Sequence, residues 1–159
     1  EKITIGIDGC SVPVHALPLA HMARGYARIT SAGHLPADQQ QAAESVFQAM
    51  NHHPEMVAGS EGFCTQLIGK SHGKLIGKIG AEGVYCIGLK NKNLGIAVKL
   101  EDGAMKRLPA VVVEVLRQLK ILNPAEYEAL EDYGHMHNLN DLGDKVGAIR
   151  PVFKLQPAG

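Results

Sequence analysis

Lys78 is the residue of this chain whose type and surroundings best suit chemistry. It lies in the apolar, strand-like run at residues 75–80, and small residues follow it at once. A lysine flanked by apolar neighbours in a central strand loses hydration, and its ammonium group can then hydrogen-bond a nucleophile or shuttle a proton. The alternative is an edge-strand lysine that reaches water and discourages aggregation. The residue type alone favours this alternative, because buried charged groups are rare.

The residues around Lys78 favour a ligand site. Three glycines interrupt the stretch from residue 77 to residue 83, and glycines in a strand indicate close approach of another group to the backbone. A free N–H there, at Ala81 for instance, could belong to an oxyanion hole. Glu82 could hold a substrate ammonium group, and it could equally be a solvent-exposed carboxylate near a strand bend. None of these residues is a nucleophile, so the catalytic residues of a hydrolase would be incomplete in this stretch.

A second group of interest joins a carboxylate and a thiol near the start of the chain. Asp8 and Cys10 are two residues apart and follow a strand-like run. They could bind or orient a soft metal such as zinc, with the remaining ligands elsewhere. From spacing alone, a turn aspartate followed by a small buried thiol is favoured, since two ligands do not close a site.

Other matches to known chemistry are weaker. His135 and His137 flank a methionine without a third ligand, and we expect them in a surface loop with no assigned role. Residues 71–74 spell Ser-x-x-Lys, but that chemistry needs a helix start, and Gly73 interrupts any helix. We interpret this match as chance.

Composition limits the class of protein. The 159 residues have a one-domain length, so we expect residues 1–159 to form a single domain. Sixteen basic and sixteen acidic residues cancel, which argues against nucleic acid as a partner. No apolar run approaches the roughly 20 residues of a membrane helix. Three cysteines without Cys-x-x-Cys spacing favour a reducing, cytoplasmic compartment.

The predicted elements combine helices with an antiparallel sheet. Alternating apolar residues predict strands at residues 3–7, 75–80, 84–89 and 94–100, and the last three form a hairpin series. Helices are expected after Pro18, after Pro36, around residues 112–119 and from the cap at Asn123 to about Tyr133. Residues 58–77 are expected to be irregular, and residues 146–153 a weak final strand. The fold class is therefore α+β, with helices packed on an antiparallel sheet.

Several blocks of the chain, taken in order, resemble one enzyme family. They are residues 8–13 (DGCSVP), 17–20 (LPLA), 23–27 (ARGYA), 56–59 (MVAG) and 78–85 (KIGAEGVY). Together they are similar to the bacterial L-asparaginases of the type II-like, thermolabile rhizobial kind. The resemblance runs from about residue 5 to about residue 100, and the last third of the chain matches more loosely.

The resemblance implies a fold similar to serine β-lactamases and glutaminases, and hydrolysis of L-asparagine to L-aspartate and ammonia. Lys78 would match the lysine on the strand that borders the active site, although Ile79 replaces the hydroxyl residue of the related β-lactamase motif. Ala81 would match a position that donates an oxyanion-hole N–H. Apart from the resemblance, we hypothesise that Glu82 contacts the substrate's α-amino group. Cys10 would match a zinc ligand, and Asp8 the carboxylate beside that metal.

The chain departs from the family in lacking the Ser-x-x-Lys nucleophile and its companion serine. We therefore expect it to be the C-terminal segment of a longer asparaginase, inactive alone and dependent on a missing N-terminal half for its serine. An incomplete sheet would expose an edge, which favours a homodimer. The alternatives are a non-catalytic binding or assembly domain, and a related serine amidohydrolase acting on glutamine or a lactam.

Overall fold

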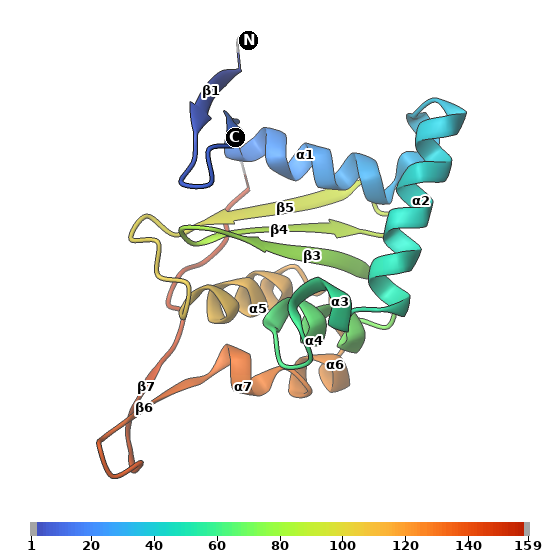
Figure 1. Cartoon of the computed structure of the whole chain (residues 1–159). Coiled ribbons are helices and arrows are strands. Elements are labelled where there is room, and N and C mark those ends of the chain that lie inside the picture. The colour runs from blue at the N-terminus through green and yellow to red at the C-terminus, as the bar shows by residue number, and fades with distance from the viewer. Residues whose placement is uncertain (1–2, 158–159) are drawn as a thin grey trace.

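The centre of the computed structural model, which describes residues 3–157, is a three-stranded antiparallel sheet in the order β3-β4-β5. Helices cover both faces of this sheet, as Figure 1 shows. The predicted α+β class is confirmed. The strands are β1 (Thr4–Ile7), β2 (Pro13–Ala16), β3 (Leu75–Gly80), β4 (Val84–Leu89), β5 (Leu94–Lys99), β6 (Met136–Leu139) and β7 (Lys145–Ile149). The helices are α1 (Leu19–Thr30), the short 3₁₀ helix η1 (Ala32–His34), α2 (Ala37–His52), α3 (Glu55–Ala58), α4 (Phe63–Lys70), α5 (Leu108–Gln118), α6 (Pro124–Glu128) and α7 (Glu131–Gly134).

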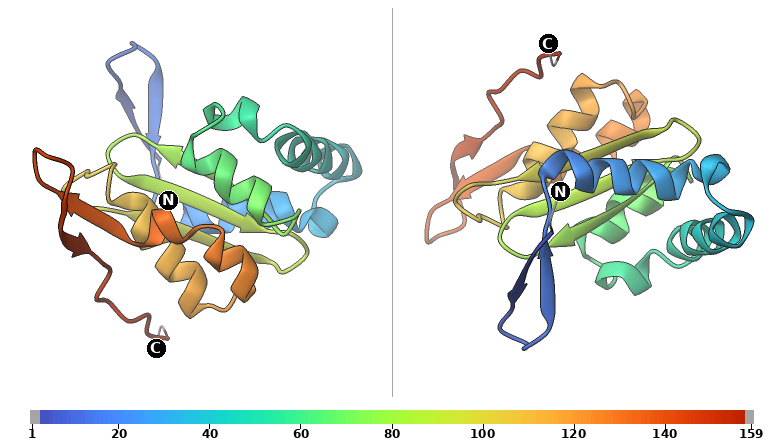
Figure 2. Two further views of the ribbon diagram at one scale, coloured as in Figure 1. Left: turned by 90° about the horizontal axis from the view of Figure 1, so that it is seen from below. Right: turned by 90° about the horizontal axis from the view of Figure 1, so that it is seen from above.

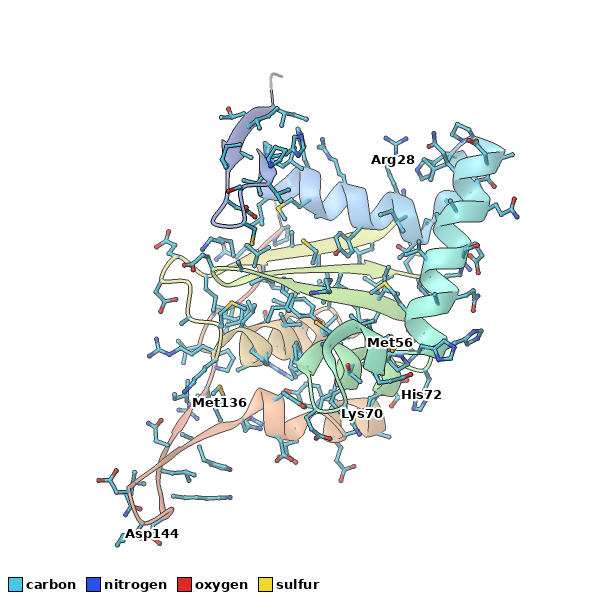
Figure 3. All side chains as sticks on the ribbon, viewed as in Figure 1. Arg28, Met56, Lys70, His72, Met136 and Asp144 are labelled. Carbon is cyan, nitrogen blue, oxygen red and sulfur yellow. The ribbon has the colours of Figure 1, made fainter. Side chains whose placement is uncertain are left out.

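Helix α1 packs against β4 and β5, and its backbone closely approaches two glycines of these strands. A Cβ atom at Gly95 would overlap the carbonyl oxygen of Ala23, and one at Gly88 would lie 2.6 Å from Thr30 Cγ2. Only glycine fits at these two strand positions. Arg28, on the other side of the helix, points away from the sheet (Figure 3). The helix therefore turns its backbone toward the sheet and its charges toward water.

The opposite face of the sheet carries the hydrophobic core. Alternate residues of β4 and β5 point to this face and meet helices α4 and α5. Leucine, isoleucine and valine dominate the core, and Tyr85 is its largest fully buried side chain. Its fully buried members include Leu67, Leu75, Tyr85, Ile87, Leu108, Val112, Val113, Leu116 and Leu130.

The prediction of an irregular segment at residues 58–77 is wrong, because the segment contains helix α4. Phe63, Cys64 and Leu67 lie on one face of this helix and are buried in the core. The turn before it is held by Thr65, whose hydroxyl lies 2.9 Å from the Pro54 carbonyl oxygen and 2.7 Å from that of Gly59. Tertiary burial of the apolar face outweighs the glycines that flank the helix.

The predicted cap at the start of α6 is confirmed. Asn123 Oδ1 accepts a hydrogen bond from the Glu126 N–H, and a Glu126 carboxylate oxygen accepts one from the Asn123 N–H, each at 2.9 Å. The same carboxylate oxygen lies 2.6 Å from Lys74 Nζ.

Beyond β7 the chain returns along α5, where the Gln118 side chain forms hydrogen bonds with the backbone of Phe153 and Leu155.

Two hairpins project from this body. Strand β1 was predicted, but its antiparallel partner β2 was not. The expected surface loop at His135 and His137 is wrong in part, because His137 lies in β6, which pairs with β7. The predicted final strand at residues 146–153 is observed only as Lys145–Ile149, before Pro151. No helix within residues 3–157 is long and apolar enough to cross a bilayer.

Candidate functional site

Lys78 lies on the edge of the three-stranded sheet. Within residues 3–157 its strand, β3, pairs only with β4, and Lys78 stands directly opposite Cys86. The expectation of a central strand is therefore wrong, and the edge-strand alternative describes its place. The side chain is exposed, and Nζ donates to the Ile79 carbonyl oxygen at 2.9 Å. Among residues 3–157 the ammonium group is hydrogen-bonded to no hydroxyl group.

The side chain of Lys78 points to the face of the sheet that α1 covers. Cys86 lies directly opposite Lys78, so the two side chains point to the same face of the sheet. Gly88, two residues after Cys86 in β4, lies on that face and contacts α1. Helix α1 lies over β4 and β5, however, and leaves the end of β3 uncovered. Lys78 is therefore exposed beside the helix. We call Lys78 together with the turn at residues 81–83 the β3 shelf.

The buried groups beside the shelf are not activated nucleophiles. Burial raises the pKa of the Cys86 thiol, so the thiol is protonated and unreactive at neutral pH. Burial also raises the pKa of the Tyr26 hydroxyl, with smaller contributions from Cys86 and Cys64. Any nucleophile that works beside Lys78 must therefore be a different group.

On the edge of β3 that faces away from β4, one backbone N–H group has a hydrogen-bond partner in helix α4. The Ile79 N–H points away from β4 and donates to Cys64 Sγ at 3.2 Å. Gly80 ends the strand, and Ala81 is the first residue of the turn that follows. Ala81 is exposed in the turn after the strand. Of the predicted residues, Ala81 is thus an exposed turn residue just past the end of the edge strand.

Glu82 adopts a left-handed backbone conformation in the same turn, with φ of 56°. Its side chain is exposed, and its carboxylate rests against Gly103, where an added Cβ would lie 2.7 Å from Glu82 Oε2. The loop between β5 and α5 thus supports the turn. Gly83 completes this contact by donating its N–H to Met105 Sδ at 3.0 Å.

Sequence reasoning missed Lys99, which holds the turn from the opposite edge of the sheet. Its Nζ donates to the Glu82 carbonyl oxygen at 2.6 Å and also to that of Leu100. Lys99 and Gly95 are four residues apart in β5, so Lys99 lies on the face of the sheet that α1 covers, as Lys78 does. Two ammonium groups therefore lie on one face, at the end of the sheet where the shelf is.

Asp8 and Cys10 form the tip of the β1–β2 hairpin. Asp8 Oδ1 accepts hydrogen bonds from the N–H groups of Cys10, at 2.8 Å, and Val12, at 3.0 Å. Ser11 has a φ of 61°, which tightens the turn. The Cys10 thiol is free and exposed, so the interpretation of a buried thiol is wrong.

The hairpin and the shelf lie at the same end of the molecule. In Figure 1 the hairpin stands on the α1 side of the sheet, at the end where the β3–β4 turn lies. Both views of Figure 2 show it projecting past the β3 edge rather than the β5 edge. The fold thus brings the two sequence-predicted groups to one side, although no hydrogen bond or ion pair joins them in the described part of the chain.

The comparison with protein families decides the relationship. The sequence model of the L-asparaginase II family matches residues 1–151. The chain belongs to the L-asparaginase II family. It is thus a member of a family of asparaginase-type amidohydrolases, whose substrate is L-asparagine. A search of curated proteins gives no match to the chain.

The zinc site that the asparaginase resemblance implies is not complete here. Residues 3–157 contain no group of three His, Cys, Asp or Glu side chains arranged to hold a metal. One oxygen of Asp8 is already engaged by two backbone N–H groups, which leaves the other oxygen and the Cys10 thiol as donors. Two donors do not fit a closed zinc site. His135 and His137 lie elsewhere, with Glu131 3.8 Å from His135.

Proposed function

We propose that this member of the L-asparaginase II family supplies the lysine strand and the oxyanion turn of an L-asparagine hydrolase. In the proposed reaction a serine hydroxyl attacks the side-chain amide carbon of L-asparagine. Ammonia leaves, and water then releases L-aspartate from the acylated serine. Lys78 positions the serine and helps to remove its proton, and the Ala81 N–H donates to the oxygen that becomes negative. Glu82 receives the α-amino group of the substrate.

The observation that carries the proposal is the open end of β3 in a chain of this family. An edge strand offers backbone donors that no neighbouring strand consumes, and the Ala81 N–H follows the one at Ile79 that already points outward. Lys78, Ala81 and Glu82 are all exposed, as a substrate site shared by the three would require.

We propose further that the serine comes from a segment other than residues 3–157, as in the N-terminal half expected from the sequence. In support, the Lys78 ammonium group has no hydroxyl partner in the described chain, and the Cys86 thiol beside it is neutral. Covering the exposed shelf with that segment would also remove water from the ammonium group. Desolvation of this kind strengthens electrostatic interactions in a site.

The test measures binding and turnover separately on the 159-residue chain. We expect L-asparagine to bind by calorimetry and L-glutamine to bind more weakly, with no ammonia released from either. Glu82→Gln should weaken binding of L-asparagine about tenfold, because a charge-assisted hydrogen bond is lost. Glu128→Gln, which makes the same change at an exposed glutamate outside the shelf, is the matched control and should bind normally.

Two results would overturn the proposal. Ammonia release from L-asparagine by the chain alone, above a blank without protein, would show that no external nucleophile is needed. Unchanged binding in both Glu82→Gln and an Ala81→Pro variant, which removes the N–H, would show that the shelf is not the substrate site. Preferential binding of glutamine or a β-lactam would instead favour the related amidohydrolase.

A second candidate function is assembly, which the β1–β2 hairpin favours. The hairpin carries apolar side chains in water, including Ile5 and Ile7, the latter 70% exposed. We propose that this surface packs against a second copy of the chain. Sedimentation should show a dimer that Ile7→Lys dissociates. A monomeric wild-type chain that binds none of the candidate substrates would contradict both functions.

Zinc at Cys10 and Asp8 and a cytoplasmic location remain proposals. Zinc would need ligands from outside residues 3–157, and no chemical step is assigned to it. A chain with Cys10→Ala that binds zinc as tightly as the wild type would exclude Cys10 as a ligand. The three free thiols are compatible with a reducing compartment.

A further inference from the structure

A second candidate binding site lies at the end of the sheet away from the β3 shelf. A pocket of about 490 Å³ opens there between the β4–β5 turn and the end of α5. Lysines come to it from three segments of the chain, and apolar side chains form its floor. Its volume falls within the range of small-molecule sites. The lysines are Lys74, Lys90, Lys92 and Lys120.

Two of these four lysines have partners, and two do not. Lys74 pairs with Glu126 at 2.6 Å, and Lys90 pairs with Glu44 while lying 4.3 Å above the centre of the Phe47 ring. Within the described chain, the ammonium groups of Lys92 and Lys120 make no hydrogen bond or ion pair. The pocket therefore holds two uncompensated positive charges, although the chain as a whole is neutral.

The backbone presents these two lysines from fixed turns. Lys120 has a φ of 53° just after α5, a place where glycine is the usual residue. A lysine there costs backbone strain, and such strain often marks a functional position. The turn that carries Lys92 is anchored to α1, because the Asn91 N–H donates to the Thr30 carbonyl oxygen at 3.1 Å. The Asn93 N–H donates to Ser31 Oγ at 2.8 Å.

The floor of the pocket is apolar and uncovered. Leu94 is 39% exposed and Leu119 is 42% exposed, and both line the pocket. Exposed apolar side chains in a pocket that also holds two unpaired ammonium groups match a ligand that has an apolar body and an anionic head. A doubly charged head suits the two free lysines, and phosphate is a common partner of lysine in proteins.

We propose that this pocket binds a phosphate monoester carried on a small apolar body. The phosphate, which carries close to two negative charges at pH 7, lies between Lys92 and Lys120. The apolar body lies on Leu94 and Leu119. This site is separate from the β3 shelf, and it does not depend on the asparaginase activity.

Phenyl phosphate is the probe, titrated into the isotope-labelled 159-residue chain at low salt with amide shifts as the readout. We expect a Kd of about 1 mM and shifts confined to residues that line the pocket. Lys92→Gln combined with Lys120→Gly should weaken binding about tenfold or more. Glycine at position 120 keeps the backbone conformation, so this variant should remain folded. Lys106→Gln is the matched control and should bind as the wild type does.

Three comparison ligands test each part of the assignment. Inorganic phosphate should bind about tenfold more weakly because it lacks the apolar body, and phenol should not shift the pocket residues. Equal affinity for inorganic phosphate and phenyl phosphate would overturn the role of the floor. Tighter binding of succinate than of phenyl phosphate would overturn the phosphate assignment. Unchanged affinity in the double lysine variant, or shifts located elsewhere, would overturn the site itself.

Discussion

Replacing Glu126 by glutamine should destabilise the chain while leaving the β3 shelf intact. The carboxylate is 4% exposed and accepts from two donors, Lys74 Nζ at 2.6 Å and the Asn123 N–H at 2.9 Å. Through them it links the start of β3 to the cap of α6. A glutamine amide oxygen can still accept from Asn123, so the variant removes chiefly the charge-assisted bond to Lys74.

The expected loss is about 1.5–2 kcal/mol. A hydrogen bond to a charged group contributes roughly 1.5–3 kcal/mol to stability. The larger cost of about 3–5 kcal/mol for an unpaired buried charge does not apply. Lys74 is 40% exposed, so its ammonium group can turn to water when the carboxylate is lost. For a chain of this length the unfolding midpoint should fall by about 3–8 °C.

The effect should depend on pH with a defined sign. Burial would raise the pKa of Glu126, but hydrogen bonds from Lys74 and the Asn123 N–H outweigh it and leave the pKa lowered. A lowered carboxylate pKa gives stability that is complete above the unfolded value, about 4.3, and is lost as the pH falls through the folded value. The difference between wild type and Glu126→Gln should therefore be largest near pH 7 and shrink below about pH 4.

Urea unfolding followed by circular dichroism measures this difference directly. Glu128→Gln is the control, because Glu128 lies in the same short helix but is exposed. It should unfold as the wild type does. Equal stability of wild type and Glu126→Gln at pH 7, or a difference that grows on acidification, would refute the argument.

Three further substitutions probe the packing around the sheet. Gly95→Ala should cost about 3 kcal/mol or more in urea unfolding, because the new methyl group overlaps the Ala23 carbonyl oxygen; a neutral result would mean that α1 does not pack as described. Tyr85→Phe should be neutral or stabilise by up to about 1 kcal/mol, since among residues 3–157 the buried hydroxyl has no partner stronger than the Cys64 thiol, whereas a clear loss would reveal one. Lys99→Met should speed amide exchange in the turn at residues 81–83, and unchanged exchange would deny Lys99 its supporting role.

Local sequence signals predicted the central sheet and the cap of α6 well. The strands at residues 75–80 and 84–89 have the predicted bounds, because alternation and flanking glycines mark both. The cap at Asn123 and Glu126 follows from side chains that satisfy helix N–H groups three residues away. Both features depend on neighbours in the sequence, which is why a single sequence sufficed.

Features that depend on distant parts of the chain were not predictable. Helix α4 is stabilised because Phe63 and Leu67 are buried in the core. No local sequence pattern predicts which residues will be buried there. The position of Lys78 at a sheet edge depends on which strands pair, and its apolar neighbours suggested a central strand instead. The β1–β2 hairpin escaped notice because β2 is short and begins at Pro13.

The glycine contact between α1 and the sheet has a mechanical consequence. Gly95 lies against the α1 backbone, and Gly88 lies against the Tyr26 carbonyl oxygen and the Thr30 side chain, so little side-chain adjustment can absorb a displacement of the helix. The segment leading into α1 is the second strand of the apolar hairpin, only two residues upstream. If the hairpin is displaced when it docks against a partner, α1 would transmit that displacement to β4 and β5.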